Sequence, residues 1–266
     1  MMYMNNVNKT LYIPLYGKAY VSKKGIILND PTAVEIWNKE GFSLKGKSKS
    51  KWLAYYMAMR SRVIDDFVNE QIEKNPEAVV LHLGCGLDSR CLRLKSQPKA
   101  FYDIDFKDVI DTRNLYFSEN SHYHMISSDV SNTSYLSQIP QNQGIIVMEG
   151  LSMYLNFKQL HALFEALNQH FSSCVIIMDV YSTLAAKASK FKNPINEVGV
   201  SEVYGIDDGN CLNTGTLTFK HELEMTPNVY ISLLDKSEQL LFRKLYAGNF
   251  SKKLYQLFVY NKGNES

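Results

Sequence analysis

The sequence predicts an α/β fold with a doubly wound sheet, in which strands and helices alternate along a chain of 266 residues. Apolar segments rich in β-branched residues, the first of them at 78–83, do not alternate apolar with polar positions, as in buried parallel strands. Helical patterns such as 157–171 lie between these segments, which is the order of βαβ units. The first strand ends in Gly84-Cys85-Gly86, as strands before a ligand-binding turn do.

The glycine turn and the segment after it predict a nucleotide- or cofactor-binding site. Gly84 and Gly86 let the backbone turn tightly and approach a ligand that a Cβ atom would exclude. The segment 87–95 suits a helix, whose N-terminal amides would face the same crevice. A dinucleotide site would have a third glycine where Ser89 stands. An NAD-dependent oxidoreductase and an ordinary strand–helix turn therefore stay open as alternatives.

Two motifs carry a resemblance to a known family. They are Leu83-Gly84-Cys85-Gly86-Leu87-Asp88-Ser89-Arg90 and Tyr102-Asp103-Ile104-Asp105-Phe106, the second followed by Val109, Ile110 and Arg113. The pattern resembles the leucine carboxyl methyltransferase family, in particular its bacterial branch that includes tetracenomycin-type polyketide O-methyltransferases. The resemblance extends from about Leu11 to about Val180.

This resemblance implies a class I methyltransferase that uses S-adenosyl-L-methionine (SAM) and releases S-adenosyl-L-homocysteine (SAH). The implied fold is a Rossmann-like, seven-stranded sheet, mostly parallel with one antiparallel strand near the C-terminus. Helices would cover both faces, and extra helices would precede the sheet. We expect one domain over 1–266, with an N-terminal helical cap at 1–75 and a SAM-binding core at 76–180. The remainder, 181–266, would hold a substrate-side insertion and the C-terminal strands.

The amino-acid composition argues against several classes of protein. The formal net charge of +2 gives no electrostatic reason to expect nucleic acid or an anionic membrane as a partner. The four cysteines form no Cys-x-x-Cys pair, so we expect reduced thiols and no metal site. The polar segment 1–10 has no signal-peptide core, and no apolar run is long enough to span a membrane. We expect a soluble, cytoplasmic protein; nothing in the sequence predicts its oligomeric state.

The N-terminal region holds one basic residue of interest and one misleading motif. The resemblance implies that Lys18 helps hold the SAM carboxylate, whereas a lysine in isolation would be a solvated side chain. The segment 41–48 fits the P-loop pattern, which requires a strand before its first glycine. The preceding 32–40 instead reads as a helix started by Pro31. We therefore interpret 41–48 as a solvated loop, and a P-loop nucleotide-binding protein is a minor alternative.

A long helical pattern at 52–74 carries Arg60 among its apolar positions. A buried arginine needs an anionic partner. The resemblance implies that Arg60 binds the SAM carboxylate. An internal pair with Asp65 or Asp66 is the alternative.

The second and third strands predict the contacts to the nucleoside. Asp105 ends the strand 101–105 and lies about 20 residues after the glycine turn, where a ribose-binding carboxylate is expected. It could also cap the helix predicted at 107–117, and both roles are compatible. The strand 123–127 leads to Asp129 and Val130, which the resemblance places beside the adenine.

The fourth strand, 144–148, is followed by Glu149. A carboxylate at the C-terminal end of a parallel strand points into the ligand crevice, and the resemblance puts this one near the SAM sulfonium or amine. Capping of a nearby helix is the alternative role. Asn156 is a cap for the helix at 157–171, and a fifth strand is expected at 174–180.

The C-terminal third is harder to interpret. Helical patterns at 184–191 and 237–245 and strands at 217–224 and 253–261 are expected, and the segment 182–215 mixes helical residues with Gly, Asn and Asp.

The function that fits these features is SAM-dependent O-methylation of a small, polyketide-like or aromatic acceptor. A carboxylate acceptor is already ionised at pH 7 and needs no base, whereas a hydroxyl acceptor would want one. Tyr154, Tyr181, His221 and Glu149 are weak candidates for that base. A protein C-terminal carboxyl group is an alternative acceptor, and a SAM-binding module without catalysis is an alternative of another class.

Overall fold

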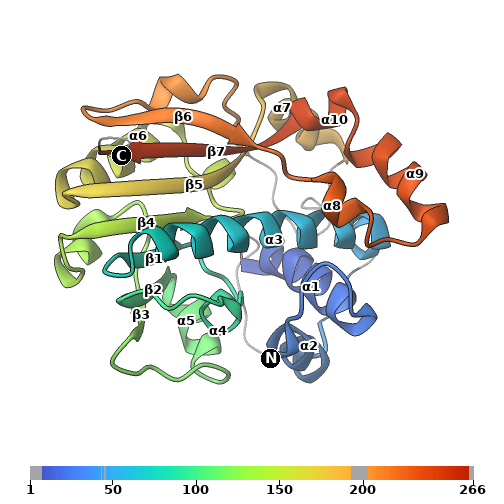
Figure 1. Cartoon of the computed structure of the whole chain (residues 1–266), viewed down its shortest axis with the longest axis horizontal. Coiled ribbons are helices and arrows are strands. Elements are labelled where there is room, and N and C mark those ends of the chain that lie inside the picture. Colours follow the sequence, from blue (N-terminus) through green and yellow to red (C-terminus); the bar gives the residue numbers. More distant parts are fainter. Residues whose placement is uncertain (1–7, 43, 45, 193–202, 264–266) are drawn as a thin grey trace.

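The computed structural model describes residues 8–42, 44, 46–192 and 203–263, and a seven-stranded mixed sheet runs through its centre (Figure 1). The strand order is β3-β2-β1-β4-β5-β7-β6. The first five strands pair in parallel, and β7 runs antiparallel to both β5 and β6. The strands are β1 Val79–Leu83, β2 Ala100–Asp105, β3 Tyr123–Ser127, β4 Gln143–Met148, β5 Ser173–Tyr181, β6 Leu217–Leu223 and β7 Tyr255–Lys262. The predicted fold class is confirmed, including the antiparallel strand near the C-terminus.

Helices cover both faces of this sheet because its central strands are apolar on both faces. Val80 and Ile145 pack in one buried cluster with α1 (Tyr12–Lys24) and α3 (Lys51–Lys74). Val79 and Ile146 belong to a second cluster with α6 (Phe157–His170). Asn156 caps α6 in a reciprocal capping box with Gln159, as its position in the sequence predicts.

The remaining helices are α2 Pro31–Glu40, α4 Arg90–Arg93, α5 Lys107–Arg113, α7 Thr183–Lys192, α8 Asn228–Ile231, α9 Lys236–Tyr246 and α10 Asn249–Leu254. In Figure 1, α1 and α9 both lie beyond the C-terminal end of β1, so that they border the edge at which parallel strands present ligands. No helix among the described residues is both long and apolar enough to cross a membrane.

Two predicted helices are shorter in the structure. The predicted helix 87–95 is reduced to α4, since Asp88 and Ser89 direct their side chains to Lys18 and Asp30 instead of continuing a helix. The helix expected at 107–117 ends at Arg113.

The P-loop alternative is wrong. Helix α2 directly precedes Gly41, and the motif needs a strand at that place. The segment Gly46–Lys49 is a short 3-10 turn.

Candidate functional site

A cavity of about 930 Å³ opens at the C-terminal ends of the parallel strands. Its walls come from the glycine turn, from α1 and α3, and from α7, α9 and α10. All nine residues that the sequence analysis assigns to the cofactor line this one cavity. They are Lys18, Arg60, Gly84, Cys85, Gly86, Asp105, Asp129, Val130 and Glu149.

The glycine turn adopts backbone conformations that favour glycine. Gly84 has φ +66° and Gly86 has φ +54°, both in the left-handed region. A Cβ atom on Gly84 would lie 3.0 Å from the Leu151 side chain, and one on Gly86 would lie 3.4 Å from Leu11. The positive φ values at both positions, and the closeness of Leu151 to Gly84, therefore favour glycine in this turn.

Two side chains support the glycine turn through hydrogen bonds to its backbone. The Asp105 carboxylate accepts a hydrogen bond from the Gly86 amide (2.7 Å). Arg113 donates to the carbonyl oxygens of Gly86 (2.9 Å) and Asp88 (2.8 Å). Arg113 is fully buried and forms an ion pair with Asp103, so α5 and β2 together fix the shape of the turn.

Asp105 faces the cavity from the end of β2. Its carboxylate also accepts from the Phe106 amide (2.8 Å), and Phe106, not Asp105, is the N-cap of α5. Burial raises the pKa of Asp105 to about 6, although the two amide donors oppose that rise.

Arg60 crosses from α3 to the ends of β4 and β5. Its guanidinium pairs with Glu149 (2.9 Å) and Asp179 (2.7 Å), so the alternative of a pair with Asp65 or Asp66 is wrong. The carboxylate of Asp65 binds Arg90 and Arg93 instead. The Nε atom of Arg60 is buried and finds no hydrogen-bond partner in the described part of the chain. A buried donor without a partner is uncommon in folded proteins.

Glu149 is held as an anion. It accepts from Arg60, from Arg90 and from the Ser61 hydroxyl (2.6 Å). Burial opposes its ionisation, but the two arginines outweigh burial and hold the pKa of the carboxyl well below its ordinary value. Such a group is a poor general base, although it suits contact with a cation.

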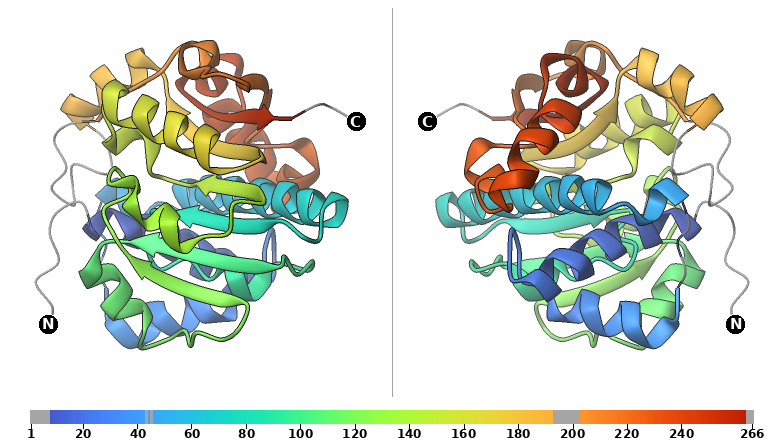
Figure 2. Two further views of the ribbon diagram at one scale, coloured as in Figure 1. Left: turned by 90° about the vertical axis from the view of Figure 1, so that its left-hand side faces the viewer. Right: turned by 90° about the vertical axis from the view of Figure 1, so that its right-hand side faces the viewer.

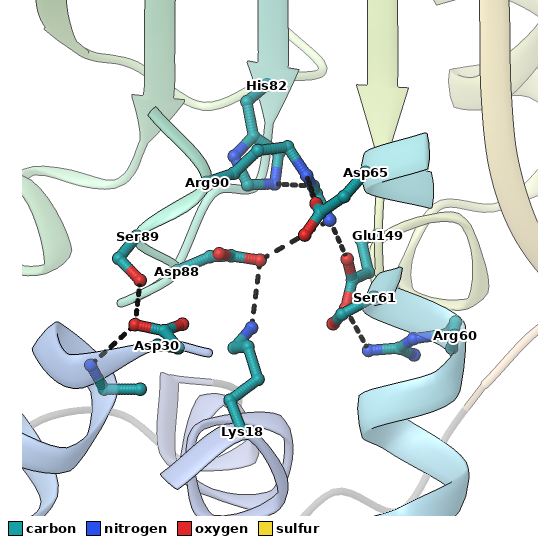
Figure 3. Close-up of polar contacts among 12 residues, drawn as sticks. Lys18, Asp30, Arg60, Ser61, Asp65, His82, Asp88, Ser89, Arg90 and Glu149 are labelled. Carbon is teal, nitrogen blue, oxygen red and sulfur yellow. Dashed lines mark hydrogen bonds and ion pairs between the residues drawn. The ribbon is translucent and has the colours of Figure 1, made fainter. Parts of the chain in front are cut away.

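Lys18 is buried, so the alternative of a solvated lysine is wrong. Its Nζ lies 2.9 Å from Asp88 on the glycine turn, as Figure 3 shows. Asp30, the N-cap of α2, accepts from Ser89 (2.5 Å) and from Arg93 (3.2 Å). Buried polar contacts therefore anchor the N-terminal helices directly to the turn.

The sequence analysis assigned no role to several members of this network. His82, for example, sits within β1 between Arg90 (3.2 Å) and Asp103 (3.1 Å). Burial lowers the pKa of His82, so the ring is neutral, and its Nδ1–H donates to Asp103 while Nε2 accepts from Arg90. The sequence offered one signal for these network residues, which is a charged or polar residue inside an otherwise apolar strand. They are His82, Asp103 and Asp179.

The adenine-side residues lie next to each other after β3. Val130 is buried, and the Asp129 carboxylate accepts from the amide and hydroxyl of Ser131 through one oxygen (both 2.8 Å). Its second oxygen accepts no hydrogen bond from the described residues and is available to a ligand.

Of the base candidates, Tyr154 and Tyr181 line the cavity, and His221 does not. His221 is exposed on the edge strand β6, away from the cavity lining, so the proposal that it is the general base is wrong. Burial raises the pKa of Tyr154, which keeps its phenol protonated at neutral pH. A protonated phenol is a hydrogen-bond donor and not a base.

Comparison with known proteins identifies the family that this chain matches. Residues 14–168, more than half of the chain, match the family described as leucine carboxyl methyltransferase. The tetracenomycin polyketide synthesis O-methyltransferase of Streptomyces glaucescens is 24% identical over 234 residues, which cover 86% of this chain and 87% of that protein. An S-adenosyl-L-methionine-dependent methyltransferase of Gibberella zeae is 25% identical over 246 residues, which cover 84% of this chain and 83% of that one.

Solved structures agree on the fold. An N-methyltransferase from Bradyrhizobium japonicum in complex with SAH superposes with a TM-score of 0.51 at 12% identity, over 77% of this chain and 88% of that one. The magnesium protoporphyrin IX methyltransferase from Synechocystis, also with SAH, gives 0.51 at 11% identity, over 87% and 94%. From the family match over more than half of its length, the chain belongs to the leucine carboxyl methyltransferase family and is a SAM-dependent methyltransferase.

Proposed function

We propose that the protein transfers the methyl group of SAM to a carboxylate oxygen of a small, largely apolar acceptor. The observation that supports this most is the unequal character of the cavity walls. The predicted cofactor residues cluster at the glycine turn, whereas among the described residues the lining contributed by α7, α9 and α10 contains no carboxylate and no imidazole. A hydroxyl acceptor would need a base on that side.

Four interactions would hold the cofactor. Asp105 would accept from the ribose hydroxyls, and the second oxygen of Asp129 would accept from the adenine amine. The Arg60 guanidinium would attract the methionine carboxylate, with Lys18 as a second cation. The anionic Glu149 would face the ammonium or sulfonium. Gly84 and Gly86 both line the cavity, so the backbone of the turn can approach the cofactor closely.

The chain's own contribution to the reaction is positioning. SAM supplies an electrophilic methyl group when it is bound. The protein must orient the acceptor and exclude water, and these effects carry much of the rate in such reactions. Burial raises the pKa of Tyr56, Tyr154 and Tyr255, all of which line the cavity. The Tyr56 and Tyr154 phenols would donate hydrogen bonds that orient an acceptor oxygen.

Matched acceptors test this proposal. With methyl-labelled SAM, we expect transfer to 2-naphthoate and none to 2-naphthol, which offers the same rings with a hydroxyl. The labelled product should release methanol in alkali, because methyl esters hydrolyse there and methyl ethers do not. A peptide with a free C-terminal leucine is the third acceptor. Faster labelling of that peptide, or an alkali-stable product, would refute the small-carboxylate proposal.

The affinity for SAM should depend on pH through Asp105. Its raised pKa of about 6 means that the carboxyl is protonated below that pH and cannot accept from both ribose hydroxyls. We expect the SAM dissociation constant to be flat above pH 7 and to rise about tenfold per pH unit well below pH 6. Asp105→Asn should bind more weakly and lose this pH dependence. Titration calorimetry from pH 5 to 8 measures both; an unchanged profile in the variant would exclude Asp105 as the titrating contact.

A further inference from the structure

The mouth of the cavity is unusually apolar for a surface in contact with water. Leu184 on α7, Leu245 on α9 and Phe250 on α10 line the cavity, yet they are 56%, 47% and 67% exposed. Three separate elements thus place large apolar side chains half in the cavity and half in solvent. Exposed apolar side chains gathered around one cavity in this way are typical of an interaction site.

The apolar surface continues along α9. Its inner face buries Glu238 and Phe242 against α3, where Phe242 contacts Tyr55. Its outer face carries Leu240, which is 79% exposed, and Leu241, one turn before Leu245. Figure 2 (right) shows α9 on the outside of the molecule, alongside α3. The helix therefore buries Glu238 and Phe242 on its inner face and also exposes leucines on its outer face.

Basic residues surround these leucines. The segment 236–254 contains five basic residues and a single carboxylate, Glu238. Glu238 is turned inward and bonds Lys51 (2.6 Å) and Tyr55 (2.8 Å). Of the basic residues, only Lys252 forms an ion pair within the described residues, with Glu224. The others are Lys236, Arg243, Lys244 and Lys253. The net charge of +2 over the whole chain conceals this local excess, because acidic residues elsewhere balance it.

We propose that this rim, formed by α9, α10 and the start of α7, docks on the surface of an anionic lipid bilayer. Leucine and phenylalanine side chains at the level of the headgroups, with lysines beside them, are the pattern of interfacial helices. Each basic residue adds attraction to anionic headgroups. Docking in this orientation turns the cavity mouth toward the lipid, so an apolar acceptor passes from the bilayer to the site without crossing water.

A bilayer fits these observations better than a protein partner. The exposed charge on 236–254 is positive, and the Asp235 and Glu224 carboxylates beside it are already paired, with Lys24 and Lys252. Protein interfaces deplete lysine and pair charges specifically. A second copy of this chain would bring the same positive charge to the contact, which opposes self-association.

Vesicle binding tests the proposal without reference to methyl transfer. The full chain should co-sediment with phosphatidylcholine vesicles that contain one third phosphatidylglycerol, and not with phosphatidylcholine alone. Leu240→Ser with Leu241→Ser, and separately Lys244→Gln with Lys253→Gln, should each weaken this binding at least tenfold. None of these four residues lines the cavity, so SAM affinity should stay unchanged and report correct folding.

A matched control uses exposed residues of the same types elsewhere. Leu115→Ser, just after α5, combined with Lys158→Gln, on α6, should leave vesicle binding unchanged. The proposal is overturned if the unmodified protein ignores anionic vesicles, or if the control loses binding as much as the rim variants. It is also overturned if the leucine variant instead converts a dimer to a monomer in sedimentation, since a second copy would then cover the face.

Discussion

Arg60→Met is expected to lower the free energy of unfolding by about 3–5 kcal/mol, because it leaves buried carboxylates without their cation. Arg60 is 3% exposed and pairs with Glu149 and Asp179. Glu149 keeps a second cation, Arg90, but Arg60 is the only cation paired with Asp179 among the described residues. The cost should therefore fall mainly on Asp179. Urea denaturation followed by circular dichroism measures the change.

The control for this experiment, Arg62, lies two residues away on the same helix. Arg62 also pairs with an aspartate, Asp66 at 2.9 Å, but both side chains are partly exposed. Arg62→Met should cost no more than about 1 kcal/mol. Adding Asp179→Asn to Arg60→Met should recover more stability than adding Glu149→Gln does. Equal losses for the two arginines would contradict the assignment of a buried network.

The same variant has an expected pH dependence. Burial already raises the pKa of Asp179, and Arg60 opposes that rise. Without Arg60, the folded-state pKa rises further above the unfolded value. A carboxyl with a raised folded-state pKa contributes stability that is complete below the unfolded pKa and is lost as pH rises through the folded one. The deficit of Arg60→Met should therefore shrink as the pH falls from 7 toward 4.

The fold was largely predictable because its strands are apolar runs with clear ends. Tyr123–Ser127 matches its prediction residue for residue, and the capped helix α6 differs by one residue at its end. The misses were local. Helix α1 falls within the expected N-terminal helical cap, but its bounds were not predicted, because aromatic residues face both α2 and α3 and leave its pattern weakly amphipathic. The short helices α8 and α10 were also missed, because four to six residues carry too little periodicity.

The site was predictable only where a motif or a resemblance named a residue. Gly84, Asp105 and Glu149 lie at strand ends, and topology alone brings such positions to one edge. Partners could not be predicted, since ion pairs join residues far apart in sequence. Arg60 illustrates this: its sequence neighbours Asp65 and Asp66 were the natural candidates, yet its partners lie 89 and 119 residues away.

The sequence analysis names Arg113 as part of the family resemblance but gives it no role. A substitution of Arg113 has the second large expected effect. Arg113→Met should lower the free energy of unfolding by about 3–5 kcal/mol by stranding the buried Asp103. It should also weaken SAM binding, because the carbonyls of Gly86 and Asp88 lose the donor that shapes the turn. Each buried acceptor left without a donor costs about 1–3 kcal/mol.

Arg113→Lys separates these two consequences. A lysine keeps a positive charge beside Asp103 but lacks the planar fork that reaches two carbonyl oxygens and a carboxylate together. It should recover most of the stability lost in Arg113→Met while SAM affinity stays at least tenfold below that of the unmodified protein, measured by calorimetry where both variants are folded. Arg62 does not line the cavity, so Arg62→Lys should leave the affinity for SAM unchanged. If Arg113→Lys binds SAM normally, Arg113 supports only the fold, and the shape of the glycine turn must come from Asp105 and the backbone alone.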